Sequence, residues 1–285
     1  MPSDAPDAPD ALGLSDAERS RRFYDEVGIL EWDRLTRSVA SRVSLELHRR
    51  LLARFITPGS RVLEIGAGPG RFTVELARLG ARVVASDISP VQLALNERLV
   101  AEAGVESAVE GRVVLDVVDL SSIDDASFDA VVVFGGPLSY AFDATETALQ
   151  GCLRVSRPTG MVLASVMSLV GSLREHLSEV VDEMSVFGVE TIDTMVQTGE
   201  QRHVPHQCRM FRWREIEAMV RRLPCELMAA SASNALTSGD SRVLEALEQD
   251  AERWSHLLDW EEELTQEPGA LDAGTHILFA VRRTG

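Results

Sequence analysis

Residues 62–73 read VLEIGAGPGRFT and decide the fold of this 285-residue chain. The apolar start is typical of a buried strand, the glycines of a tight turn, and the residues after Gly70 of a helix. A second apolar run, VVASD at 83–87, ends in the acid Asp87. A strand, a glycine-rich loop, a helix and a second strand with an acid at its tip form a unit that binds a nucleoside-containing cofactor at the carboxyl ends of parallel strands.

The spacing of the glycines distinguishes between cofactors. Dinucleotide-binding loops follow G-x-G-x-x-G, in which the third glycine lets the helix pack close to the strand around a pyrophosphate. Here Gly66, Gly68 and Gly70 alternate with other residues. Arg71 stands where that fingerprint has its third glycine, and Glu64 precedes the first glycine by two residues. This pattern resembles motif I, E-x-G-x-G-x-G, of the class I S-adenosylmethionine-dependent methyltransferases.

The resemblance implies an α/β fold and a cofactor. The fold is a Rossmann-like, mostly parallel seven-stranded sheet with helices on both faces, and the cofactor is S-adenosylmethionine. Glycines let the backbone approach that ligand without a Cβ clash, and the helix N-terminus after the loop can face its carboxylate. We expect these cofactor-binding residues: Glu64, Gly66, Ala67, Gly68, Gly70, Asp87, Ile88, Asp116, Val117, Phe134 and Gly135.

Two acids in that set have expected partners. Asp87 follows Gly66 by about 20 residues, which is the spacing expected of an acid that accepts hydrogen bonds from ribose hydroxyls. Ser89 and Pro90 can cap and start the next helix, which leaves Asp87 free for a ligand. In the family, an acid at the exit of the third strand, expected here at 113–117, pairs with the adenine amino group. By position this acid is Asp116, and Asp119 competes with it for the role.

The loop after the expected fourth strand, 130–134, narrows the acceptor class. It continues as Gly135-Gly136-Pro137 and offers only backbone. It lacks the Asn/Asp-Pro-Pro-aromatic signature of methyltransferases that act on nitrogens in nucleic acids. It also lacks the aspartate that Mg²⁺-dependent catechol-type members use as a ligand. We therefore expect no metal and no base flipping.

Composition excludes several other classes. Against 45 acidic residues stand 28 basic ones, a formal net charge of −17 that repels nucleic acid and anionic membranes. The chain has no lysine, which excludes a Walker-type loop and a Schiff-base or pyridoxal phosphate lysine. Cys152, Cys208 and Cys225 are widely spaced, so neither a disulfide framework nor a zinc site is expected. The acidic N-terminus and the lack of a long apolar run favour a cytoplasmic protein, and the lysine-free usage favours a high-GC bacterial source.

The pattern along the chain predicts four parts. These are a disordered tail (1–14), an N-terminal helical cover (15–57), a core domain (58–285), and a helical insertion after the fifth strand (168–210) that forms part of the acceptor site. Helical spacing runs through 24–55, and an acidic helix is expected at 243–264. A closing antiparallel strand is expected at 274–281.

Candidates for chemistry lie in the insertion and around it. An acceptor that loses a proton needs a base, and histidine suits that task best. His203 and His206 are such candidates, with a surface or packed histidine as the alternative for each. Pro205 between them argues against a zinc pair. The expected catalytic residues are His203, His206 and Tyr140, and the expected acceptor-pocket residues are Tyr24, Trp32 and Tyr140.

These observations together predict methyl transfer from S-adenosylmethionine to an oxygen or nitrogen of a small molecule, by in-line displacement, in bacterial specialised metabolism. One alternative is a non-catalytic S-adenosylmethionine-binding or regulatory protein. Another is an NAD(P)-dependent oxidoreductase, which Arg71 and the absence of any Tyr-x-x-x-Lys pair disfavour. The sequence leaves the acceptor and the oligomeric state open, with a homodimer as one option.

Overall fold

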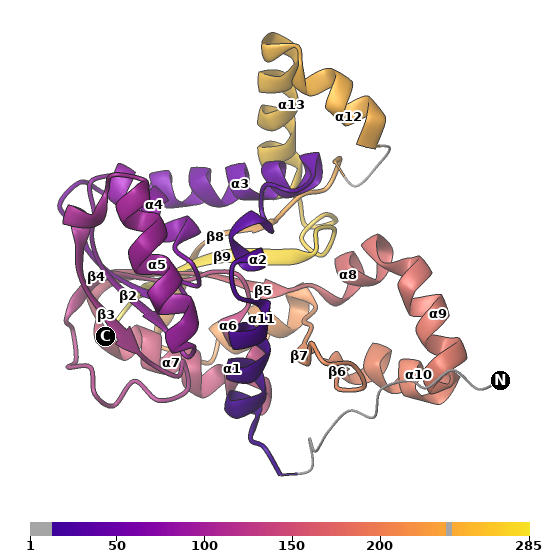
Figure 1. Cartoon of the computed structure of the whole chain (residues 1–285), viewed down its shortest axis with the longest axis horizontal. Coiled ribbons are helices and arrows are strands. Elements are labelled where there is room, and N and C mark those ends of the chain that lie inside the picture. The colour runs from indigo at the N-terminus through magenta and orange to yellow at the C-terminus, as the bar shows by residue number, and fades with distance from the viewer. Residues whose placement is uncertain (1–12, 238–240) are drawn as a thin grey trace.

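The computed structural model describes residues 13–237 and 241–285 (Figure 1). Its central sheet contains β1 (Arg61–Ile65), β2 (Arg82–Asp87), β3 (Val109–Val114), β4 (Phe128–Val133), β5 (Ser156–Met167), β8 (Cys225–Ala232) and β9 (His276–Arg283). The spatial order is β3-β2-β1-β4-β5-β9-β8. Strands β1 to β5 are parallel, and β9 runs antiparallel between β5 and β8. The predicted seven-stranded, mostly parallel sheet with a closing antiparallel strand is confirmed.

Helices bury both faces of the sheet, because the central strands are apolar on both sides. Leu63 and Val131 pack into one core with α6 (Pro137–Tyr140), α7 (Thr145–Val155) and α11 (Trp213–Val220). Val62 and Ala130 pack into another with α3 (Val39–Phe55) and α4 (Arg71–Arg78). Helix α5 (Pro90–Glu102) belongs to the same domain. Short 3-10 turns lie at Glu106–Ala108 and Phe142–Ala144.

The N-terminal cover consists of α1 (Asp16–Val27) and α2 (Leu30–Asp33), which precede α3. The predicted helical segment 24–55 is therefore three helices. Gly28 ends α1 with a φ of +53°, and Ser38 caps α3 by accepting a hydrogen bond from the Ser41 N–H. In Figure 1, α1 and α2 lie between the helices α4 and α5 and the insertion that follows β5. This position brings the cover to the carboxyl ends of the parallel strands.

The third strand begins and ends earlier than the apolar pattern predicts. We expected it at 113–117, but β3 ends at Val114, and the Asp116 carboxylate turns the chain by accepting a hydrogen bond from the Val118 N–H. β3 is an edge strand with exposed residues, so its apolar content does not mark its limits. The correction moves Asp116 from the strand into the loop beyond it.

The insertion contains α8 (Leu169–Glu175), α9 (Leu177–Phe187), α10 (Val189–Thr198) and the hairpin of β6 (Glu200–Gln201) and β7 (Cys208–Arg209). It is the helical segment expected after the fifth strand. The single helix expected at 243–264 is two, α12 (Ser241–Glu248) and α13 (Ala251–Leu264), because Asp250 caps a new helix. Within residues 13–237 and 241–285, no helix is long and apolar enough to cross a membrane. Most of the expected tail, 1–14, lies outside the described residues.

Candidate functional site

The glycine loop holds β1 close to the loop after β4. Gly66 has a φ of +71°, and a Cβ at this position would lie 2.3 Å from Cγ of Pro137, the first residue of α6. A side chain would therefore meet both backbone strain and a clash. The Gly68 N–H donates a 2.8 Å hydrogen bond to Oδ2 of Asp87, which ties the loop to the end of β2. This edge of the sheet is thus fixed by backbone geometry.

A cavity of about 310 Å³ opens at this edge. It lies at the carboxyl ends of the parallel strands, where α/β proteins of this topology bind their ligands. Most of the expected cofactor residues line it: Gly66, Ala67, Gly68, Asp87, Ile88, Asp116, Val117, Phe134 and Gly135. Residues 115–118 line it as one continuous stretch, whereas Asp119 does not reach it. The geometry therefore favours Asp116 over Asp119.

Asp87 is more strongly engaged than we expected. Its carboxylate accepts a backbone hydrogen bond on each oxygen, from Gly68 and from Ser89, both at 2.8 Å. The side chain is therefore not free, contrary to the sequence-based expectation. Each carboxylate oxygen retains a second acceptor position for a ligand hydroxyl. Burial raises the pKa of Asp87 to about 6, against the opposing effect of the two N–H donors.

Glu64 and Gly70 lie beneath the loop, outside the cavity lining. The buried Glu64 carboxylate accepts a 2.6 Å hydrogen bond from the Thr73 hydroxyl, which in turn accepts one from the Asn96 amide. Burial raises the pKa of Glu64 to about 8. A Cβ on Gly70 would meet Val100 at 2.7 Å. Both residues support the loop from behind, where the sequence had suggested direct contact with the ligand.

Two tyrosines from distant parts of the chain complete the cavity wall. Tyr24 of α1 and Tyr140 of α6 line it and are hydrogen-bonded through their hydroxyl groups. The Tyr140 hydroxyl also lies 2.9 Å from Nε2 of His206. His206 does not line the main cavity, but it lines a small neighbouring one together with both tyrosines. Three of the expected acceptor-side residues are thus brought together.

Two other expected residues lie elsewhere. His203 pairs with Glu183 of α9 at 3.0 Å and packs against Phe187, away from both cavities. Trp32 does not line the main cavity either, because the Arg71 guanidinium covers its ring at 3.8 Å. The residue pattern does not reveal these contacts, which lie within the insertion for His203 and between the cover and α4 for Trp32.

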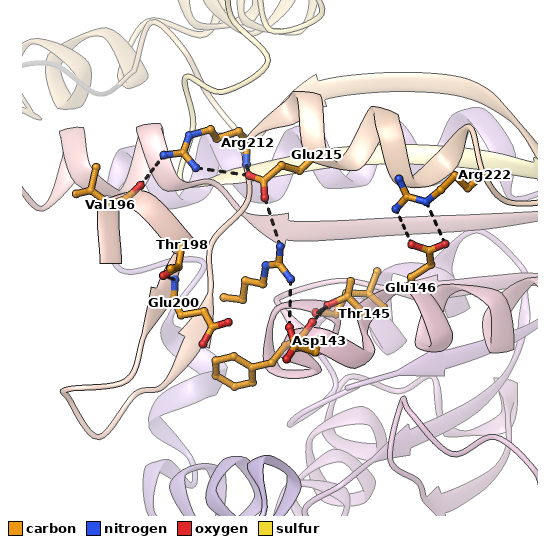
Figure 2. Close-up of polar contacts among 12 residues, drawn as sticks. Asp143, Thr145, Glu146, Val196, Thr198, Glu200, Arg212, Glu215 and Arg222 are labelled. Carbon is orange, nitrogen blue, oxygen red and sulfur yellow. Dashed lines mark hydrogen bonds and ion pairs between the residues drawn. The ribbon is translucent and has the colours of Figure 1, made fainter. Parts of the chain in front are cut away.

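Two further arginines join the insertion to the core outside the cavity, and a third joins the turn after α11 to α7. Figure 2 shows Arg212 directed at the Val196 carbonyl and at Glu215, and Arg222 paired with Glu146. Arg209 bridges Glu215 and Asp143, at 3.4 and 3.8 Å. These ion pairs give Arg209 and Arg212 a role in holding the insertion against α11 and the loop before α7.

Sequence reasoning missed Arg34 as a wall residue. Its Nε donates a 2.5 Å hydrogen bond to Glu31, and both residues line the main cavity. Its guanidinium also approaches Gly135, since a Cβ on that glycine would lie 3.2 Å from it. A charged pair three residues apart beside Trp32 was visible in the sequence, but only the fold shows that it faces the end of β4.

Comparison with known proteins identifies the domain around this cavity. Residues 62–160 match a family described as "Methyltransferase domain". Residues 62–160 are therefore a methyltransferase domain, and the match supports a class I S-adenosylmethionine-dependent methyltransferase. S-adenosylmethionine is the cofactor of this family. The matched segment carries β1 to β4 and the glycine loop, so it includes the expected cofactor residues.

A curated relative and two solved structures extend this result. Ubiquinone biosynthesis O-methyltransferase of Xanthomonas oryzae (strain PXO99A) is 36% identical over 117 residues, which are 41% of this chain and 46% of that protein. The chain thus matches less than half the length of this relative. The cyclase SpnF shares the fold with a TM-score of 0.58 and 16% identity, over 95% of this chain and 97% of that one. Geranyl diphosphate methyltransferase, in complex with GPP and sinefungin, shares it with a TM-score of 0.51 and 14% identity, over 84% and 78%.

Proposed function

We propose that the methyltransferase domain transfers a methyl group from S-adenosylmethionine to an oxygen or nitrogen of a small-molecule acceptor. One observation carries the proposal: most of the expected cofactor residues and the two tyrosines line one and the same cavity. The domain match supports the cofactor, and the curated relative, an O-methyltransferase by name, supports methyl transfer to an oxygen. We also propose a cytoplasmic enzyme of bacterial specialised metabolism, and the net charge of −17 favours a small acceptor over nucleic acid.

The wall offers a group for each part of the cofactor. Asp87 can accept hydrogen bonds from the ribose hydroxyls, and Asp116 can accept one from the adenine amino group. Arg34 and the N-terminus of α4 offer positive charge to the carboxylate of the cofactor itself. The bound cofactor supplies an already activated, electrophilic methyl group on sulfur. The protein therefore has to align the acceptor atom and exclude water, which the cover of α1 and α2 can do.

A turnover assay tests this proposal. The purified full-length chain is incubated with S-adenosylmethionine and fractionated small-molecule extracts, and S-adenosylhomocysteine is measured. The proposal predicts S-adenosylhomocysteine in at least one fraction, above a control without acceptor. Binding of the cofactor with no product in any fraction would instead support the non-catalytic alternative. The assay has to measure methyl transfer itself, because a protein named as a cyclase shares this fold and the fold alone does not decide the reaction.

A further inference from the structure

The two tyrosines of the acceptor wall are the only tyrosines in the sequence. They come from α1 and α6, 116 residues apart, and their hydroxyl groups are hydrogen-bonded to each other. The Tyr140 hydroxyl also contacts Nε2 of His206, 2.9 Å away, in the loop between β6 and β7. Three side chains from the cover, the core and the insertion thus form one hydrogen-bonded chain.

This chain connects two spaces. Tyr24 and Tyr140 line the main cavity and also the small neighbouring cavity, whereas His206 lines only the small one. Asp16 and Gln207 belong to the wall of the small cavity as well. A proton that moved along the chain from Tyr24 to His206 would therefore leave the wall of the main cavity.

Contacts with the core fix the position of Tyr24, the first residue of this hydrogen-bonded chain. The buried Gln92 amide donates hydrogen bonds to the backbone carbonyls of Tyr24 and Gly28, at 2.8 and 3.1 Å. The Ser89 hydroxyl donates another to Asp25, one residue further along α1. The His206 ring in turn packs against Phe23, with 4.9 Å between the ring centroids. Tyr24 and His206 are therefore held by the same helix.

All three groups are neutral in this setting. Burial raises the pKa of both tyrosines above the ordinary value, and burial with the nearby Arg34 lowers the pKa of His206 to about 4. A neutral phenol is both a donor and an acceptor, and a neutral imidazole has one donor and one acceptor nitrogen. The hydrogen bonds can therefore all point toward His206 or all point away from it.

We propose that Tyr24, Tyr140 and His206 relay a proton from the reactive atom of the acceptor to the small cavity. The relay rests on the proposed methyl transfer and specifies its substrate class. The reactive group has to be a hydroxyl or an N–H amine, because it must donate a hydrogen bond and lose a proton. Carboxylates and tertiary amines have no proton for the relay.

The step balances without a further reagent. The acceptor proton passes to the Tyr24 oxygen, the Tyr24 proton to Tyr140, and the Tyr140 proton to Nε2 of His206. The electron pair left on the acceptor forms the bond to the methyl carbon, while the pair of the carbon–sulfur bond stays on sulfur. As Nε2 gains this proton, the His206 ring releases its other proton from Nδ1, so the ring stays neutral. Both tyrosines end neutral, as they began.

Kinetics of the full-length protein with the acceptor found in the turnover screen test the relay. Tyr140→Phe and His206→Leu should each lower kcat ~100-fold or more, the typical value of a lost proton-transfer group. KM and the Kd for S-adenosylhomocysteine should stay within about twofold if the roles are limited to the proton. His203→Leu is the matched control, since this histidine lies in the same loop and outside both cavities. A kcat of Tyr140→Phe equal to that of the wild type, or an equal loss in His203→Leu, would overturn the relay.

A spectroscopic measurement does not depend on turnover. With ¹³C at Cζ of tyrosine, the protein should give two signals, one for each tyrosine. His206→Leu should shift both signals, that of Tyr140 more, and His203→Leu should shift neither. Signals unmoved by His206→Leu would show that the chain does not exist in solution. The last outcome is that His206→Leu shifts both signals, while the wild-type protein binds cofactor but turns over no acceptor. The hydrogen bonds would then exist, and both the methyl transfer and the relay would be contradicted.

Discussion

The glycine-loop edge and the tyrosine wall face the same cavity, yet they are built in different ways. The loop edge uses backbone geometry and hydrogen bonds within residues 64–89, together with the close long-range approach of Gly66 to Pro137. The tyrosine wall joins residues 24, 140 and 206 through side chains alone. The first region should therefore fail through backbone strain and loss of cofactor binding. The second should fail through loss of rate, with the fold and the cofactor site kept.

The largest effect is expected at the loop edge, from Gly66→Ala. A left-handed backbone costs a residue with a Cβ roughly 1–2 kcal/mol, and the overlap with Pro137 adds about 1–3 kcal/mol. We expect this variant to lose ~2–5 kcal/mol of unfolding free energy in urea and to bind S-adenosylhomocysteine poorly. Gly104→Ala is the control, because its φ of +75° is similar but nothing lies within 4 Å of its Cβ position. Equal losses in the two variants would show that the Pro137 contact is unimportant.

Asp87→Ala should have the next largest effect, on affinity. Losing charge-assisted hydrogen bonds to the ribose should weaken S-adenosylhomocysteine binding by ~1–3 kcal/mol in calorimetry. Asp119→Ala should leave the affinity unchanged, since Asp119 does not line the cavity. If Asp119→Ala weakened binding and Asp87→Ala did not, the assignment of the acidic residues would be wrong.

The pH dependence of binding sharpens the same assignment. Because the pKa of Asp87 is raised to about 6, its carboxylate gains a proton as the pH falls through 6 and becomes a weaker acceptor. The affinity for S-adenosylhomocysteine should be constant above pH 7. It should fall by up to about 1.4 kcal/mol per pH unit below pH 6. In Asp87→Asn the affinity should be lower at pH 7.5 and lack this slope. An unchanged slope in that variant would assign the titration to another group.

The smallest effect is expected where the insertion meets the cover. Arg202 pairs with Asp16 of α1 at 3.0 Å and with Glu200 at 2.6 Å, but its side chain is 41% exposed. Solvent-exposed ion pairs contribute about 0–1 kcal/mol. Arg202→Ala should therefore change the unfolding free energy by less than ~1 kcal/mol, and less at high salt than at low salt. A loss above ~1 kcal/mol would show that the ion pairs of Arg202 stabilise the contact between the insertion and the cover more strongly than exposed ion pairs do.

The same contrast explains what the sequence could and could not predict. Gly66 and Asp87 were expected from the glycine motif and its spacing to the acid, and Asp116 from the resemblance to the family; all three lie in the cavity wall. The seven-stranded sheet was expected from the resemblance that the glycine motif carries, and the structure has it. The limits of β3 were not predicted correctly, because an edge strand carries exposed residues and its apolar pattern is weak.

Long-range contacts account for the remaining differences. His203 and His206 lie three positions apart, and the sequence cannot distinguish their roles. In the fold only His206 contacts Tyr140, whereas His203 contacts Glu183. Arg34 enters the site because Gly28 breaks the helical segment and turns the chain toward the end of β4. Glu64 belongs to the motif but supports the loop through Thr73.

Calorimetry of the purified chain with S-adenosylhomocysteine, run beside NADH, tests the central claim most directly. The loop edge predicts a micromolar Kd for S-adenosylhomocysteine and no binding of NADH, since Arg71 stands where a dinucleotide loop has its third glycine. Binding of NADH, or of neither ligand, would contradict the cofactor assignment of the cavity.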